Sequence, residues 1–83
     1  MREWLMAHLR LFAAARDAAG RASDEIPGAT VDEILDAATV RYGDAFAHLL
    51  PSCRIWLNGE AAEHDDPVAD DDEVAVLPPV SGG

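Results

Sequence analysis

Apolar and polar residues alternate along three stretches of the chain, from Leu5 to Phe12, from Cys53 to Asn58 and from Glu73 to Leu77. A period of two predicts strands that bury one face and leave the other face outward. On the buried faces we expect Ala7, Leu9 and Leu11 in the first stretch, Cys53, Ile55 and Leu57 in the second, and Val74 and Val76 in the third. The outward faces then carry His8, Arg10 and Phe12, followed by Arg54, Trp56 and Asn58, and by Ala75 and Leu77.

A helical period of about 3.6 residues replaces the alternation after Thr30. Thr30 and Glu33 fit a capping box, in which each side chain accepts a hydrogen bond from the backbone N–H of the other residue. Gly43 is expected to end this helix in a left-handed conformation, and a shorter helical segment is expected over residues 13–19, ending at Gly20. The apolar side of the main helix is predicted to consist of Val31, Ile34, Leu35 and Ala38.

Turn-forming residues divide the rest of the chain. Asn58-Gly59 predicts a two-residue hairpin, because both residues tolerate the positive φ of a type I′ turn. The return strand is expected over residues 60–63, followed by a polar strap over 64–72 in which Val68 is the buried anchor. Two smaller elements are also expected, a mostly polar strand over residues 23–26 and a helical turn over 45–50.

Two hairpin-like strand pairs on either side of one amphipathic helix predict the order β-β-α-β-β-β. This is an α+β domain whose mixed sheet packs on one main helix, the β-grasp or ubiquitin-like architecture. A chain of 83 residues has room for one domain, which we assign to residues 1–77, with a flexible C-terminal tail over 78–83. In such a sheet the first strand lies beside the last, so Phe12 and Leu77 are expected to adjoin on the outward face, near Trp56.

The net charge limits the kinds of molecule that the protein is expected to bind. Sixteen Asp and Glu against six Lys and Arg give a formal charge of -10, which argues against nucleic acid, because phosphate binding depends on clustered cations. The acidic surface either steers the protein toward basic protein surfaces or is simply solvated. No stretch has the roughly 18 apolar residues of a membrane span, and the N-terminus lacks the pattern of a secretory signal. The single cysteine, Cys53, cannot form an internal disulfide, which favours a reducing, cytoplasmic setting.

The body of the domain offers little catalytic chemistry. His8, His48 and His64 lack the spacing of metal ligands, and Cys53 has no second thiol nearby. The acidic run at residues 70–73 lacks the alternate spacing and glycine of a calcium loop, so we expect no metal site. The inward position of Cys53 also predicts a buried thiol of high pKa, and hence a poor nucleophile.

The chain ends in Leu77-Pro78-Pro79-Val80-Ser81-Gly82-Gly83. Prolines prevent a strand ladder from continuing, and glycines lack Cβ, so this segment leaves the sheet stiff and ends slim. Its six residues after Leu77 reach roughly 20 Å when extended, enough to place Gly83 inside another protein's active site. The reactive group would then be the terminal carboxylate; the alternative is an ordinary frayed terminus.

Several motifs resemble the MoaD/ThiS family of ubiquitin-like sulfur carriers, and within it the small subunits of molybdopterin synthase. The resemblance covers nearly the whole length, and the Pro-Pro-Val-x-Gly-Gly ending after a strand is its most specific part. One departure is Asp71, where members of the family commonly have glycine between two Asp residues. The matching segments are Leu11-Phe12-Ala13 with Arg16, Thr30-Val31, Asn58-Gly59-Glu60, and Asp72-Glu73-Val74-Ala75 leading into the tail.

The resemblance implies a sulfur-carrying subunit that is not catalytic alone and binds no cofactor stably. An E1-like adenylating enzyme would use ATP and Mg²⁺ to activate Gly83, a sulfurtransferase would supply sulfur, and Gly83 would become a thiocarboxylate. The large subunit of molybdopterin synthase would then transfer this sulfur to cyclic pyranopterin monophosphate during molybdenum cofactor biosynthesis. The family's partner-contacting positions match Phe12, Arg16, Ala61, Leu77 and the tail residues Pro78, Pro79, Val80 and Ser81, with Gly82 preceding the reactive terminus.

Three other functions stay open at this point. The thiocarboxylate could serve thiazole or cysteine biosynthesis. Alternatively, the chain could be a ubiquitin-like modifier that is joined to lysines through Gly83. A β-grasp module that only binds other proteins is the third alternative.

Overall fold

The structure, a computed structural model, describes residues 6–79. The elements within that range are β1 (Met6–Leu11), α1 (Ala13–Ala19), β2 (Ser23–Pro27), α2 (Val31–Tyr42), α3 (Asp44–Leu49), the 3-10 helix η1 (Leu50–Ser52), β3 (Arg54–Leu57), β4 (Glu60–Ala61) and β5 (Glu73–Leu77).

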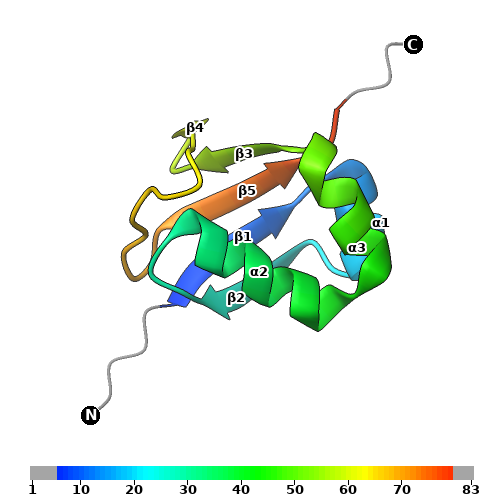
Figure 1. Ribbon diagram of the computed structural model, residues 1–83, viewed down its shortest axis with the longest axis horizontal. Helices are drawn as coiled ribbons and strands as arrows, with labels where there is room; N and C mark the ends of the chain where they lie inside the picture. The colour runs from blue at the N-terminus through cyan, green and yellow to red at the C-terminus, as the bar shows by residue number, and fades with distance from the viewer. Residues whose placement is uncertain (1–5, 80–83) are drawn as a thin grey trace.

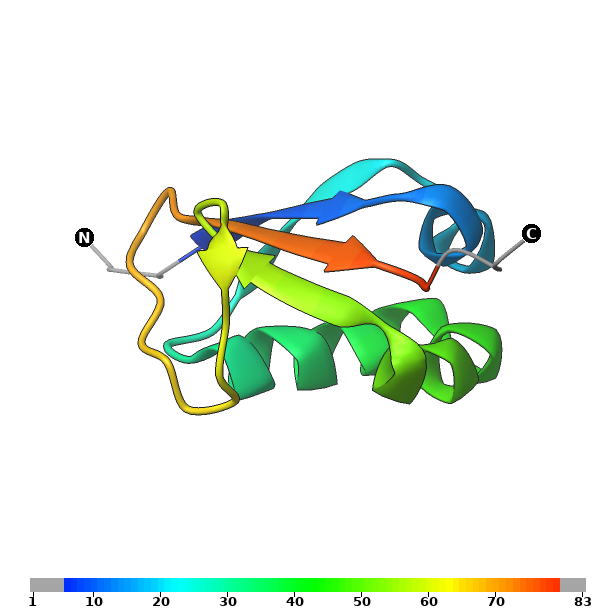
Figure 2. The ribbon, with the colours of Figure 1, turned by 90° about the horizontal axis from the view of Figure 1, so that it is seen from above.

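The strands form one mixed sheet in the order β2-β1-β5-β3-β4. β1 and β5, the first and last strands, are neighbours as predicted; they pair in parallel, and the other neighbours are antiparallel. Helices α2 and α3 lie against one face of the sheet, and the opposite face, here called the outer face, is left uncovered by helices (Figures 1 and 2). This arrangement confirms the predicted α+β, β-grasp fold.

The inward residues of the strands meet the apolar side of α2 to form the core. The inward residues predicted for β1 and β5, and the four predicted for α2, are all buried, and so is Val68 in the strap. In β3 the predicted inward residues Cys53, Ile55 and Leu57 pack against the core while partly exposed. Phe46 of α3 is also fully buried, with its ring 5.2 Å from that of Tyr42 in an edge-on arrangement. The polar/apolar alternation therefore predicted the faces correctly.

The start of α2 differs from the predicted capping box in one bond. Thr30 accepts from the Glu33 N–H at 3.2 Å as expected, but the Glu33 carboxylate accepts from the Ala29 N–H at 2.8 Å, one residue earlier than predicted. The strap explains the shift, because it holds the chain before the helix extended, with the Val68 N–H donating to the Ala29 carbonyl. In this conformation the Ala29 N–H is the donor within reach of Glu33.

The expected left-handed cap at Gly43 is also wrong in detail. Gly43 has φ 95° but ψ -167°, outside the left-handed helical region. Its N–H donates to the Thr39 carbonyl at the end of α2, and its own carbonyl accepts from Ala47 at the start of α3. Gly43 therefore joins two helices, and the helical turn predicted over 45–50 is a helix that starts at Asp44 and continues into η1.

The hairpin after β3 forms as predicted. Asn58 and Gly59 have φ of 51° and 86°, as a type I′ turn requires. The return strand is shorter than expected, since β4 spans only Glu60–Ala61. In the strap, Asp71 has φ 72°, so aspartate takes the left-handed position where the family commonly has glycine.

Candidate functional site: the outer face at the tail end

Strand pairing arranges the outward side chains of the sheet in rows. The row at the tail end contains Arg54 and Leu77, which are cross-strand partners, and Phe12, which follows β1 directly. The middle row runs from Ala61 through Trp56 and Ala75 to Arg10. The far row contains Glu73, His8 and Glu25. The outer face therefore has apolar residues beside Arg54 at the tail end and carboxylates beside His8 at the opposite end.

A small pocket of about 260 Å³, here called the apolar pocket, runs along the outward side of β5 and reaches Phe12 and Leu77 at the tail end of this face. The Phe12 side chain is 37% exposed, an unusual state for a phenylalanine, and it adjoins Leu77 as the sequence predicted. The backbone fixes this position, because the Phe12 N–H donates to the Val76 carbonyl at 3.2 Å. The pocket is lined by Phe12, Trp56, Gly59, Glu73, Ala75 and Leu77.

Arg10 lies beside the apolar pocket on β1, where it is the cross-strand partner of Ala75. Its Nη1 lies 3.2 Å from the Glu73 carboxylate, and its guanidinium carbon lies 5.6 Å from the centre of the Phe12 ring. The guanidinium therefore forms an ion pair and a cation–π contact at once. The alternation placed Arg10 outward but gave no indication of this double contact.

Two other predicted docking residues, Arg16 and Ala61, are next to residues that line the pocket. Arg16 is exposed on α1, one turn after Phe12, whose carbonyl accepts from the Arg16 N–H at 3.4 Å. Ala61 is exposed on β4 and pairs with Trp56, which extends the apolar row to the edge of the sheet. The structure thus brings Phe12, Leu77 and Arg16 to the tail end of the domain, whereas Ala61 lies in the middle row at the edge of the sheet.

The tail begins at the end of β5, beside the pocket. Leu77 and Pro78 are partly buried and Pro79 is exposed. The remaining tail residues predicted to act, Val80, Ser81, Gly82 and Gly83, lie outside the described residues. The division into a domain over 1–77 and a tail over 78–83 stays a prediction, although β5 does end at Leu77.

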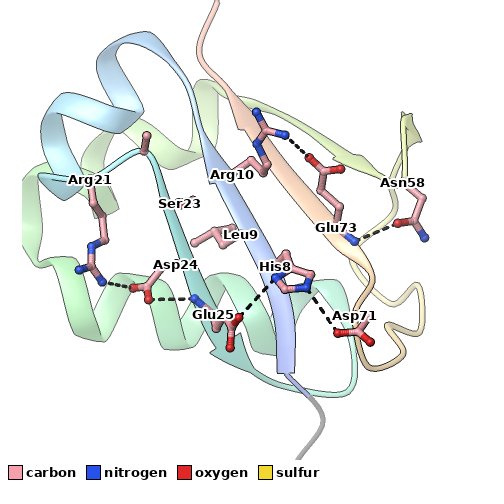
Figure 3. Close-up of a pocket in the computed structure, with 11 residues that line it drawn as sticks. His8, Leu9, Arg10, Arg21, Ser23, Asp24, Glu25, Asn58, Asp71 and Glu73 are labelled. Atoms are coloured by element: carbon pink, nitrogen blue, oxygen red, sulfur yellow. Dashed lines mark hydrogen bonds and ion pairs between the residues drawn. The ribbon is translucent and has the colours of Figure 1, made fainter.

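A wider polar groove crosses β1 and β2 at the charged end of the outer face (Figure 3). His8 stands at its centre between two carboxylates, with Nδ1 3.6 Å from Glu25 and Nε2 3.4 Å from Asp71. Glu73 follows in register on β5. These contacts bind β1, β2 and the strap together across the face.

Asp24 is the centre of a partly buried polar cluster that the sequence did not reveal. The Asp24 side chain is only 10% exposed and accepts from the Tyr42 hydroxyl at 2.7 Å and from Arg41 at 3.0 Å, while Arg21 lies 3.0 Å away. Burial alone would raise the pKa of Asp24, but the hydrogen bonds from Tyr42, Arg21, the Glu25 N–H and Arg41 hold the pKa well below its ordinary value of 3.8. Burial and the same hydrogen bond raise the pKa of Tyr42.

Nothing in this cluster points to catalysis, and Cys53 does not either. Burial raises the pKa of the Cys53 thiol, whose Sγ donates to the Leu49 carbonyl at 3.4 Å, so the thiol is a poor nucleophile, as its inward position predicted. Among residues 6–79, no three His, Cys, Asp or Glu side chains group in a way that could hold a metal ion. Within the same range, none of the helices has the length and apolar character needed to cross a bilayer.

A mixed sheet folded around one main helix, an apolar pocket beside the last strand, and a chain that continues from that strand to Gly82-Gly83 define a ubiquitin-like β-grasp protein. The ThiS family profile matches residues 9–83, and the chain belongs to this family. It is therefore a small sulfur-carrier protein of the MoaD/ThiS type, which does not catalyse a reaction alone. A comparison with curated protein sequences gives no match.

Solved structures show the same fold over almost the whole chain. SAMP1 from Haloferax volcanii is 30% identical, with a TM-score of 0.84 and coverage of 94% of this chain and 99% of that one. A putative molybdopterin converting factor subunit 1 from Pyrococcus furiosus is 26% identical, with a TM-score of 0.82 and coverage of 92% and 99%. The complex of subunits 1 and 2 of molybdopterin-converting factor from Helicobacter pylori contains a match of 25% identity and TM-score 0.69, covering 95% of this chain and all of that one.

Proposed function

We propose that the protein is the sulfur-carrying small subunit of molybdopterin synthase, and that Gly83 delivers sulfur to cyclic pyranopterin monophosphate as a thiocarboxylate. The observation that carries the proposal is the apolar pocket between Phe12 and Leu77, at the start of the Pro78–Gly83 segment. A partner that covers this pocket receives the tail in its own active site. The similarity to the Pyrococcus furiosus and Helicobacter pylori proteins supports this choice within the family.

The chemistry of the terminal carboxylate explains why an activating partner is needed. With a pKa near 3.5 the carboxylate of Gly83 is ionised at neutral pH and is a poor electrophile. An E1-like adenylating enzyme, using ATP and Mg²⁺, converts it to an acyl-adenylate and releases pyrophosphate. The terminal sulfur of a sulfurtransferase persulfide then attacks the acyl carbon and displaces AMP, and a thiol reduces the resulting acyl disulfide to the thiocarboxylate.

During activation the acyl carbon of Gly83 is the electrophile, whereas during sulfur delivery the thiocarboxylate sulfur is the nucleophile. The thiocarboxylate sulfur attacks a carbon of the pyranopterin in the large subunit and displaces an oxygen substituent from that carbon. Water then cleaves the bond between the sulfur and the acyl carbon, which restores the Gly83 carboxylate and leaves the sulfur on the pyranopterin. The tail suits both steps, since Pro78 and Pro79 cannot extend the strand ladder and Gly82-Gly83 fits a narrow channel. The six residues after Leu77 reach roughly 20 Å.

The adenylating enzyme and the large subunit should use the same outer face in turn. Pro78 and Pro79 leave the sheet beside the apolar pocket, so a protein that takes up the tail from this side covers Phe12 and Leu77. Two partners cannot cover one pocket at once. Activation and sulfur delivery are therefore separate encounters, which we place in the cytoplasm, where ATP and reducing thiols are available.

Reconstitution tests this function directly. The full chain is incubated with an adenylating enzyme, ATP, Mg²⁺, a sulfurtransferase and cysteine, and intact mass spectrometry follows replacement of one oxygen by sulfur. The product is then mixed with the large synthase subunit and cyclic pyranopterin monophosphate, and molybdopterin is measured. A variant lacking Gly83 should fold normally yet fail at both steps. Full activity of that variant would refute the proposal.

A second function is favoured by a specific observation, the 30% identity to the small archaeal modifier protein SAMP1 of Haloferax volcanii. A modifier would form an isopeptide between Gly83 and a lysine. The 83 residues contain no lysine, so any isopeptide product must join Gly83 to a different protein, which makes the adduct easy to recognise by mass. Such adducts, without molybdopterin formation, would favour the modifier over the carrier.

A further inference from the structure

The charges of this protein are divided between its two ends. Eight of its sixteen acidic residues lie between Glu60 and Glu73, which includes the strap, and this stretch contains neither Lys nor Arg. The strap enters β5 at the end of the sheet opposite to the tail (Figures 1 and 2). Six of these carboxylates, between Glu63 and Asp72, therefore lie in the strap and the residues next to it, away from Phe12 and Leu77, whereas Glu73 lines the apolar pocket and is paired with Arg10.

The arginines show the complementary distribution. Arg10, Arg21 and Arg41 each form an ion pair with a carboxylate of the same chain, at 3.2, 3.0 and 3.0 Å. Arg16 and Arg54 are exposed and form no ion pair with any residue in the range 6–79. In a chain with such an excess of carboxylates, two arginines without an internal carboxylate partner are a notable exception.

Both of these arginines lie at the tail end, on opposite sides of the apolar pocket. Arg54 is the cross-strand partner of Leu77, on the β3 side. Arg16 lies one helical turn after Phe12, on the α1 side. The pocket between them is lined by Phe12, Trp56 and Leu77. Aromatic residues and arginine are the residue types that contribute most to protein interfaces.

We propose that Arg16, Arg54 and the apolar pocket form one docking surface for a protein that presents carboxylates on both sides of an apolar side chain. The apolar side chain fills the pocket, and each guanidinium binds a carboxylate through its planar, two-pronged set of donors. Arg54 is the new element, since its role follows from its position beside Leu77 and from its lack of an ion pair with any residue in the range 6–79. The inference rests on the proposed function, because it describes the partners that receive the tail.

The charge division also fixes the orientation of the complex. An acidic partner surface is repelled by the carboxylates of the strap and attracted by the two arginines, so it approaches the tail end. In that orientation Pro78 and Pro79 lead into the partner. The same carboxylates oppose docking in the reverse orientation, in which the tail would point into solvent.

Isothermal titration calorimetry with the large synthase subunit and, separately, with the adenylating enzyme of the same organism tests the inference. Arg54→Gln and Arg16→Gln should each weaken binding about tenfold, and Arg54→Lys less, because it keeps the charge but loses the paired donors. The matched control is Val40→Glu. Val40 is 86% exposed on α2, on the other layer of the domain, and this change lowers the net charge by the same single unit.

The outcomes separate this inference from the function on which it rests. If the wild-type chain binds and Arg54→Gln binds equally well, the arginine contact is refuted and the proposed function stands. If Val40→Glu weakens binding as much as Arg54→Gln, net charge explains the effect and the inference is again refuted. If the wild-type chain binds neither protein, both proposals fail. Unchanged melting temperatures would show that the variants are folded.

Discussion

Replacing Asp24 by asparagine should destabilise the domain at neutral pH without weakening its binding to partners. Asp24 joins three parts of the fold, because its carboxylate accepts from Tyr42 and Arg41 of α2 and pairs with Arg21 before β2. Asparagine has nearly the same shape, but it carries no charge and directs two N–H donors toward groups that are themselves donors.

The size of the effect follows from these contacts. The hydrogen bond from Tyr42 is worth about 1 kcal/mol net. The side chains of Arg21 and Arg41 are 52% and 45% exposed, so water can replace much of their interaction with the Asp24 carboxylate. Each of these ion pairs therefore contributes only about 0.5 kcal/mol to stability. The sum is about 2 kcal/mol, which corresponds to a fall in melting temperature of roughly 10 °C for a domain of this size.

The effect should depend on pH with a definite sign. The folded protein holds the pKa of Asp24 below its ordinary value of 3.8, so the carboxylate stabilises the fold fully above that pH. The stabilisation is lost as the pH falls through the lower folded-state pKa. The difference in free energy of unfolding between wild type and Asp24→Asn should therefore be full at about pH 7 and narrow at about pH 3.

Urea unfolding followed by circular dichroism at both pH values measures this difference. The control is Asp36→Asn, which removes an exposed carboxylate from α2, the helix that carries Tyr42 and Arg41. An equal loss of stability in the control, or a gap that does not narrow in acid, would show that the hydrogen bonds of Asp24 are not its source. Weaker binding of the large subunit would show that the cluster shapes the docking surface.

Three further substitutions test the apolar pocket, the tail and the backbone strain at Ala13. Leu77→Glu should weaken binding to the large subunit at least about tenfold, since it places a charge in the apolar pocket; calorimetry that finds unchanged affinity would eliminate the pocket as a docking site. Gly82→Ala should reduce thiocarboxylate formation much more than the melting temperature, and equal losses in both would contradict a role in the partner's channel. Ala13 has φ 50°, so Ala13→Gly should stabilise the fold by about 0.5–1 kcal/mol, whereas a lower melting temperature would argue against strain at this residue.

Local patterns predicted most of the fold because each depends on neighbours in the sequence. The alternation in β5 gave its bounds, and Asn58-Gly59 gave the turn, since few other residues tolerate two positive φ values in succession. The capping prediction failed where a distant segment intervened. The strap bonds to the residues before α2, and this moved the Glu33 contact from Thr30 to Ala29.

Of the site, only the outward residues of the strands could be predicted from the sequence. Parity and strand order together placed Phe12 beside Leu77, with Trp56 nearby. The Asp24 cluster, by contrast, joins residues from β2, from α2 and from the turn before β2, and no periodic pattern records such contacts. Likewise, the two arginines without an internal partner became visible only once the folded chain showed where each carboxylate lies.

The position of β5 has a mechanical consequence. β5 lies between β1 and β3 and is hydrogen-bonded to both, and the tail continues directly from its end. A force that pulls the tail along the strand axis loads the bonds of both ladders together in shear, so no single bond can break ahead of the others. If a partner takes up the tail as we propose, the two ladders of β5 are expected to resist a pull on the tail better than the contacts at the docking surface do.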